Sequence, residues 1–281
     1  MNLKTAPAAV RWSVYAAIAL IFAIICVMLS NWQFSRNDAR AEQLALAERN
    51  YDAAPLALDD AVSSVDVFDG ELEWHPVAVE GSYLPDDQLV VRNRPHGGTS
   101  AFEVLVPFRA DDGRILIVNR GWVPPAESGD GPAVIAAPPA GDVTITVRMR
   151  PGEALPTSGR SAPAGQVPTI ALPLIAETAG PDTITSAYGI LATEDPAPTE
   201  RPQPLDAPSI DPGPFLSYAI QWILFAIMGF VFIGYIIRTE VKHAREDAAE
   251  DRVPDAPRPA RARRTDRDAV DEDALLDHIG H

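Results

Sequence analysis

The stretch that most constrains the fold is an uncharged run of 23 residues at 215–237. At about 1.5 Å rise per residue, a helix of this length crosses the roughly 30 Å hydrocarbon core of a bilayer with some tilt. Arg238, Lys242 and Arg245 follow the run.

 Residues 202–214, which precede the run, contain no lysine or arginine. Because positively charged flanks stay on the cytoplasmic side, we expect the carboxyl-terminal end of this helix to be cytoplasmic.

A second uncharged stretch of 18 residues, at 12–29, predicts another membrane span. The competing interpretation is a cleaved signal peptide. The apolar run is longer than a typical signal-peptide core and no small-x-small cleavage site follows it, so we expect a retained anchor. Two spans place both termini on the same side of the membrane. We therefore expect both termini in the cytoplasm and residues 30–214 outside it.

The composition excludes several classes of function. The chain has 281 residues with 23 Lys+Arg against 39 Asp+Glu, a net charge of −16. This acidic balance argues against nucleic acid as a partner, because nucleic-acid binding needs a basic surface. Cys26 is the single cysteine, so no intramolecular disulfide can form. No Cys pair or Cys/His cluster is present to hold zinc or copper, and we expect no metal site.

The region between the two spans reads mainly as β structure. Short runs rich in Val, Ile and Phe are separated by turn sequences, a pattern typical of an antiparallel barrel or sandwich. The runs cover 77–84, 89–93, 102–108, 115–119, 143–149 and 184–192. A weak helical pattern through Leu44 predicts that the first helix extends outward over 38–50.

The sequence therefore predicts a membrane protein with two transmembrane helices that bracket a mainly β extracytoplasmic domain. The tail is rich in Pro, Arg, Asp and Ala from residue 253 on, with little to bury, so we expect it to be disordered. The expected parts are a cytoplasmic N-terminus at 1–11, a helix at 12–29, the outer domain at 30–214, a helix at 215–237 and a cytoplasmic, charged and disordered tail at 238–281.

Three motifs stand out in this arrangement. They are LSNWQFSR at 29–36, LIVNRGWVP at 116–124 and LSYAIQW at 216–222. In this order, on two helices around one β domain, they resemble the Surfeit locus family of cytochrome c oxidase assembly factors. That family shows a Trp-Gln-x-x-Arg segment, an Asn-Arg-Gly-Trp-Val-Pro strand end and a Tyr-Ala-x-x-Trp segment. The resemblance covers about residues 12 to 238.

The resemblance implies a heme or partner contact site at the outer membrane face. Its expected members are Trp32, Gln33, Arg36, Arg120, Tyr218, Gln221 and Trp222. A guanidinium at Arg36 or Arg120 would pair with a heme propionate. Further matched positions read as structural: Gly81, Tyr83, Arg94, Asn119, Gly121, Trp122 and Pro124. From the residues alone, the favoured interpretation is that Arg120 is an ion-pair partner inside the domain and Trp122 a core residue.

One position departs from the family pattern. Family members often carry a histidine three residues before the tyrosine of the third motif, and in bacterial members this histidine is implicated in holding heme a. The residue here is Phe215. We therefore expect no firmly bound cofactor and only a transient contact with heme a.

The function implied by the resemblance is that of a chaperone of the respiratory chain in the cell membrane. It would assist heme a insertion into an aa-type cytochrome c oxidase, or maturation of the catalytic subunit. The expected partners are oxidase subunits, heme a synthase and membrane lipid. The alternative is a stably bound accessory subunit of a respiratory complex with a structural outer domain. We expect no enzyme and no catalytic residues, because no nucleophile–base spacing is present.

Overall fold

The structure is a computed structural model that describes residues 7–128, 131–157, 159 and 162–250. The predicted disorder from residue 253 on lies outside the described residues. The chain divides into two compact units. The first joins residues up to Asn31 with residues from Tyr218 on, and the second is Trp32–Ser217.

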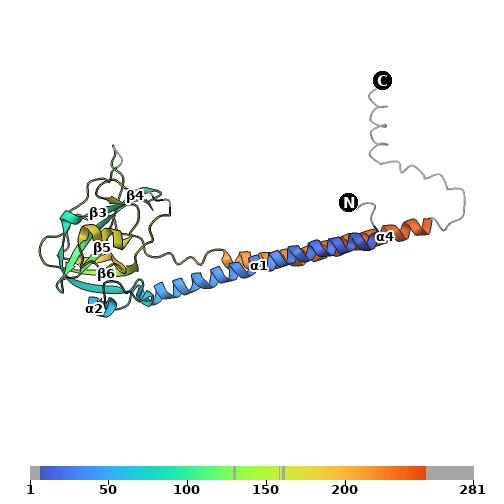
Figure 1. The fold of residues 1–281 in the computed structure, drawn as a ribbon, viewed down its shortest axis with the longest axis horizontal. Helices are drawn as coiled ribbons and strands as arrows, with labels where there is room; N and C mark the ends of the chain where they lie inside the picture. Colours follow the sequence, from blue (N-terminus) through green and yellow to red (C-terminus); the bar gives the residue numbers. More distant parts are fainter. Residues whose placement is uncertain (1–6, 129–130, 158, 160–161, 251–281) are drawn as a thin grey trace, which may run out of the picture. The chain divides into compact units, whose positions relative to one another are not determined.

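The first unit consists of two long helices, α1 (Ala8–Asn50) and α4 (Phe215–Glu250), of which α1 continues into the second unit. Of the residues that the structure describes, these two helices are long and apolar enough to cross a membrane, as the sequence predicted. In this unit they run side by side (Figure 1). The Ser30 hydroxyl donates to the Ala219 carbonyl at 2.9 Å, and Arg11 pairs with Glu240 at 3.1 Å. These contacts make the helices antiparallel.

Small side chains let the two helices approach each other. Ala19, Ala23 and Cys26 of α1 and Ala219 of α4 are buried, whereas most of the larger apolar side chains of both helices are exposed. Close backbone approach through small residues is typical of helix pairs in membranes. The buried Cys26 is a packing residue of this pair.

Both helices are longer than the predicted spans. α1 runs unbroken through the 38–50 segment, in agreement with the weak helical pattern there. α4 continues past residue 237 to Glu250, so the prediction of a disordered tail from 238 is wrong for 238–250. This segment is rich in Ala, Glu, Lys and Arg, which favour helix, and Lys242 faces Glu246 one turn away at 3.7 Å.

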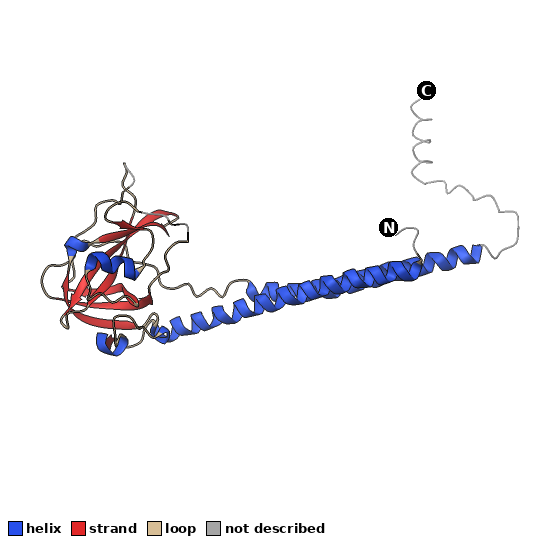
Figure 2. Ribbon diagram, in the orientation of Figure 1, coloured by secondary structure: helices blue, strands red, loops and turns tan. Residues whose placement is uncertain are grey.

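The second unit contains all the strands of the described chain (Figure 2). The sheet order is β1-β2-β6-β8-β5-β4-β3-β7, and β2 also pairs with β4. Strands β2, β6, β8, β5 and β4 therefore close into a barrel. The strands are β1 (Leu56–Ala57), β2 (Pro76–Tyr83), β3 (Leu89–His96), β4 (Thr99–Ala110), β5 (Ile115–Val123), β6 (Val143–Pro151), β7 (Gln166–Val167) and β8 (Ala187–Asp195).

The sequence pattern suggested an antiparallel barrel or sandwich, but the barrel is not wholly antiparallel. β5 and β8 pair in parallel, as do the short pairs β1–β2 and β3–β7. The physical reason for the β5–β8 pair is the odd number of strands in the closed ring. Five strands cannot alternate in direction all the way round, so one neighbouring pair must be parallel.

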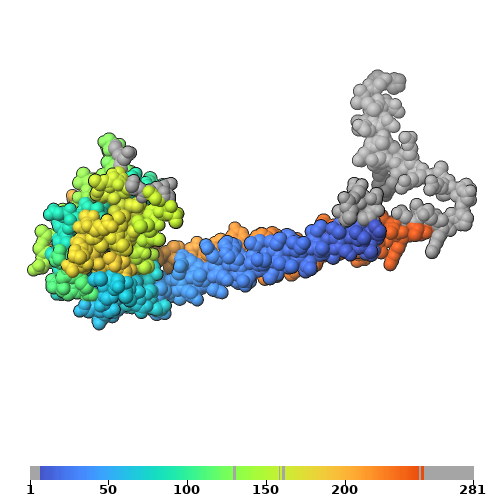
Figure 3. All heavy atoms as spheres, viewed as in Figure 1, coloured from blue at the N-terminus to red at the C-terminus, as the bar shows by residue number. Residues whose placement is uncertain are grey.

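Two apolar clusters hold the domain together. One fills the barrel and includes Phe108, Ile145 and Met149. The other lies between the sheet and α3 (Leu172–Ala179), a helix that the sequence analysis missed. Leu172, Ile175 and Ala179 are buried at helical spacing. The helix, in yellow, lies on the visible surface of the domain (Figures 1 and 3).

Gly81 lies where the barrel closes. It pairs with Val143 on β6 and with Ala110 on β4. A Cβ at this position would lie 2.0 Å from the Arg109 carbonyl oxygen, so a side chain would keep β2 from reaching β4. The Val-x-Gly-x-Tyr segment at 79–83 thus allows the barrel to close, and its Tyr83 side chain is buried in the interior.

Candidate functional site

The Asn-Arg-Gly-Trp-Val-Pro motif shapes the end of β5 to receive the segment that leads to α4. The Asn119 side-chain oxygen accepts from the Gly121 backbone N–H at 3.1 Å. Gly121 has a φ of +119°, and a Cβ there would lie 2.2 Å from the Gln203 carbonyl oxygen. The N–H and C=O of Trp122 pair with those of Gln203, both at 2.8 Å. Pro124, at the end of the motif, is exposed.

Arg120 points into the domain. Its Nη2 donates to Glu194 Oε1 at 3.0 Å, and its guanidinium lies 5.3 Å from the Tyr83 ring centroid. The Tyr83 hydroxyl donates to Glu194 Oε2 at 2.9 Å. Burial and the nearby Glu194 raise the pKa of Tyr83, which stays a neutral donor. The Arg120 side chain has no exposed surface in this structure, which agrees with the alternative interpretation of an ion-pair partner inside the domain, and its contact with a ligand stays a prediction.

A second polar cluster lies beneath the motif and centres on the buried carboxylate of Glu103. This carboxylate accepts from Asn119 Nδ2 at 2.8 Å and contacts His96 Nε2 at 3.0 Å and Arg94 Nε at 3.3 Å. The His96 ring stacks on Trp122 with centroids 5.4 Å apart and an angle of 9° between the planes. Asn119 and Trp122 thus hold the β3–β4 hairpin against β5.

Arg94 extends this cluster to Glu153, with which it is in direct contact. The other oxygen of Glu153 accepts from the Thr169 hydroxyl and from the Ile170 N–H, the latter at 3.0 Å. Burial alone would raise the pKa of Glu153, but these hydrogen bonds and Arg94 outweigh burial and lower it. Burial likewise opposes the Arg94 cation, but its carboxylate partners raise its pKa. Arg94 is thus placed as a structural residue.

The part of α1 that belongs to the second unit carries a different kind of surface. Trp32, Arg36 and Arg40 follow one another at intervals of four residues and share one face of the helix. The Arg36 guanidinium lies 5.6 Å from the ring centroid of Trp32 and 5.6 Å from that of Phe215. Trp32 is 55% exposed, and Gln33 beside it is half-buried. This surface combines a cation with flat apolar rings.

Arg40 holds the connector between the β domain and α4, which we define as residues 196–214. Its Nε and Nη2 both donate to the Asp211 carbonyl at 3.0 Å, and Nη2 donates to the Ser209 carbonyl at 2.9 Å. The Asp211 side chain accepts from the Gly213 N–H at 2.8 Å. Ile210, between the two carbonyls that Arg40 holds, is 89% exposed.

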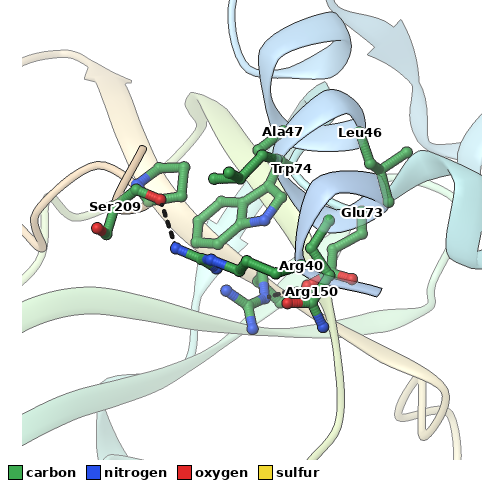
Figure 4. A pocket seen from close by; sticks show the side chains of 10 residues that line it. Arg40, Leu46, Ala47, Glu73, Trp74, Arg150 and Ser209 are labelled. Atoms are coloured by element: carbon green, nitrogen blue, oxygen red, sulfur yellow. Dashed lines mark hydrogen bonds and ion pairs between the residues drawn. The ribbon is translucent and has the colours of Figure 1, made fainter. Parts of the chain in front are cut away.

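Two adjoining hollows surround Arg40, and we call them together the Arg40 groove. The first has a volume of about 520 Å³ and is lined by Arg36, Ala39, Arg40, Gln43, Ser209, Asp211, Gly213 and Phe215. The second has a volume of about 150 Å³ and shares Arg40, Gln43 and Ser209 with the first. Its remaining walls include Glu73, Trp74 and Arg150, and the guanidinium groups of Arg40 and Arg150 lie beside the indole (Figure 4).

Trp74 is held in an unusual backbone conformation at the wall of the groove. Its φ of +71° is rare for a bulky residue and persists only where the surroundings impose it. The Arg150 guanidinium lies 4.1 Å from the indole centroid, and the Tyr51 ring lies 6.2 Å away. The Trp74 N–H donates to the Met149 carbonyl at 2.8 Å. These contacts hold the indole against the end of α1.

The donor set of the groove fits only part of a heme. Guanidinium groups suit propionates and aromatic rings suit a macrocycle face. Of the described histidines, His75 and His96 belong to the β domain and His243 to α4, and none lines the groove. In the described parts of the chain, no group of three His, Cys, Asp or Glu residues could hold a metal ion. The groove thus supplies no iron ligand.

The predicted site residues fall into three places. Trp32, Gln33 and Arg36 belong to the second unit, and Arg120 to its core. The third place is the helical unit, where Trp222 packs edge to face on Phe225 at 5.7 Å and where Tyr218 and Gln221 are exposed. That Trp32 and Trp222 form one site stays a prediction.

Sequence reasoning missed several groove residues. Arg40 continues the four-residue interval of Trp32 and Arg36, a signal that could have found it. Trp74, Arg150 and Ser209 come together only through barrel closure and the path of the connector. Nothing in their local sequence indicates this.

The fold and the groove define a class: membrane proteins with two helices that anchor a β-barrel domain inserted between them. The sequence model of the SURF1 family matches residues 20–227, and the chain belongs to this family.

Three relatives illustrate the range of similarity. An uncharacterized SURF1-like protein of Mycobacterium tuberculosis is 32% identical over 262 residues, which cover 91% of this chain and 94% of the relative. A SURF1-like protein of Monosiga brevicollis is 31% identical over 144 residues, 45% of this chain and 49% of the relative. The cytochrome oxidase assembly protein SHY1 of Saccharomyces cerevisiae is 27% identical over 109 residues, 38% of this chain and 28% of the relative.

Proposed function

We propose that this protein assists the assembly of an aa-type cytochrome c oxidase. Its membership of the SURF1 family and its similarity to a yeast protein named for cytochrome oxidase assembly support this proposal. It acts as a chaperone and not as an enzyme, with oxidase subunits and heme a synthase as its partners. It resides in the cell membrane with both termini in the cytoplasm. The pairing of Arg11 with Glu240, which brings the far ends of both helices together, supports a common side for the termini.

The finer role is a transient contact with heme a during maturation of the catalytic subunit. The observation that carries it is the position of Arg36 between the rings of Trp32 and Phe215, at the wall of an open hollow. Arg36 pairs with a propionate, and the rings cover part of the macrocycle. Heme a, once in the oxidase, supplies the redox-active iron. Because Phe215 stands where the family often has histidine, the iron ligand comes from a partner.

A deletion strain tests the assembly role. We expect membranes of the strain to lose heme a absorbance in a reduced-minus-oxidised spectrum, and to lose oxidase activity, while the oxidase transcript persists. Normal heme a content and activity, in a strain with no second copy of the gene, would refute the proposal.

The same strain, complemented with an affinity-tagged copy, separates an assembly factor from an accessory subunit. An assembly factor should co-purify with immature oxidase subunits and be lost from the active enzyme. Stoichiometric recovery with the mature, active oxidase would instead show a stably bound accessory subunit.

A further inference from the structure

Arg40 is a cation without a described counter-ion. All of its hydrogen bonds among the described residues go to the neutral carbonyls of Ser209 and Asp211. The Asp211 carboxylate accepts from the Gly213 N–H and makes no hydrogen bond to Arg40 among the described residues. Arg40 also lines both hollows of the groove, so a ligand in either one would meet its guanidinium.

A carboxylate is a stronger partner for this guanidinium than a carbonyl. Hydrogen bonds between two charged groups are roughly twice as strong as neutral ones, and a carboxylate can accept two of them side by side from arginine. A carboxylate that reaches the groove would therefore compete directly with the two connector carbonyls.

The connector around Ile210 has few other attachments. Its own contacts are local: the Asp211 N–H donates to the Ser209 hydroxyl at 3.2 Å, and Gly213 binds the Asp211 side chain. Nearer the barrel, the connector is fixed by the Trp122–Gln203 pair. Loss of the Arg40 bonds would thus free the stretch between Gln203 and Phe215 while leaving the barrel intact.

We propose that Arg40 is a ligand-responsive latch. A carboxylate in the groove takes the guanidinium from the Ser209 and Asp211 carbonyls and releases the connector that leads into α4. The inference rests on the proposed contact with a propionate-bearing heme and deepens it, because it predicts that ligand binding changes the mobility of the connector. Binding at the groove loosens the link between the β domain and the second membrane helix.

A spin label at position 210 tests the latch in the full-length protein in detergent micelles. The variant Ile210→Cys is made in a Cys26→Ser background, so that one thiol is labelled. The probes are metal-free protoporphyrin, which has two carboxylates and needs no iron ligand, and its dimethyl ester, which has none. Val134, which is 96% exposed in another loop, provides the control label site.

We expect the diacid to narrow the spectrum at 210, to the line width that the Arg40→Gln variant shows without ligand. The dimethyl ester should leave the spectrum unchanged, as should the diacid at 134. Arg49→Gln, a change of an exposed arginine on the same helix, should behave like the unchanged protein.

The porphyrin absorbance, recorded in the same samples, separates the two proposals. Binding of the diacid without a change at 210 would overturn the latch and leave the heme contact standing. Absence of binding would overturn both the contact and the latch, while the oxidase assembly role is tested independently by the deletion strain. Equal release by the dimethyl ester would overturn the carboxylate exchange.

Discussion

Arg120 and Glu194 form an ion pair inside the β domain, with Nη2 and Oε1 3.0 Å apart and side chains 0% and 2% exposed. The pair joins the Asn-Arg-Gly-Trp-Val-Pro motif on β5 to the last strand of the barrel. Tyr83, from the Val-x-Gly-x-Tyr segment on β2, donates to the same carboxylate. Two sequence motifs that lie far apart along the chain therefore meet on one buried charge.

Removal of one partner should be costly. Arg120→Met leaves Glu194 buried without its counter-charge, and we expect a loss of about 3–5 kcal/mol in the free energy of unfolding. The double variant Arg120→Met, Glu194→Leu should recover much of this loss. Arg49→Met is the control, expected within about 0.5 kcal/mol because its pair with Glu71 is exposed. Denaturant titrations in micelles give these values. An Arg120→Met variant as stable as Arg49→Met would contradict the importance of the buried ion pair.

Gly121→Ala should destabilise the domain by about 1–3 kcal/mol from the backbone conformation alone, with a further loss from the clash at Gln203. Gly70→Ala is the matched control, because a Cβ there meets nothing within 4 Å and the φ is not in the left-handed region. Thermal unfolding followed by circular dichroism compares them. Equal transition temperatures for the two variants would show that the Trp122–Gln203 pairing is not as tight as described.

Glu153 should make the domain sensitive to acid. Its pKa in the folded protein is lower than its ordinary value of 4.5, so its stabilising contribution is present above that value and is lost as the pH falls below it. Glu153→Gln should be less stable at neutral pH and should lose less stability between pH 4.5 and lower values. Denaturant midpoints measured across this range test the slope. If the stability of Glu153→Gln fell with pH as steeply as that of the unchanged protein, Glu153 would not be the group responsible.

The topology can be tested with single cysteines in a Cys26→Ser background. We expect an impermeant thiol reagent to label Val134→Cys in intact cells and to label Ala249→Cys only after the membrane is opened. Both positions are exposed, so accessibility in the folded protein does not limit the reaction. The reverse pattern would place the β domain in the cytoplasm.

Much of the fold follows from local sequence patterns. The two apolar runs and the six β-rich runs each became an element, because hydrophobic length and alternation act within a few residues. The parallel β5–β8 pair could not be predicted, since it depends on how many strands close the ring. α3 was missed because a short apolar run can become a strand or a helix, and packing decides between them.

The candidate site was less accessible to prediction. Trp32 and Arg36 were found because they lie in one motif on one helix. Arg120 lies in an equally clear motif, yet its side chain turns inward to Glu194, and only the barrel geometry reveals this. Arg40 and Trp74 matter through contacts with the connector and with β6, which are distant in the chain.

The most direct test of the account is the heme a content of membranes from the deletion strain, complemented with variants at matched protein levels. Arg36→Ala and Trp32→Ala should restore less heme a absorbance than the unchanged gene. Arg49→Ala, on the same helix but outside the groove, should restore it fully. Full restoration by both the Arg36→Ala and Trp32→Ala variants, with oxidase activity to match, would contradict the claim that this surface serves oxidase assembly.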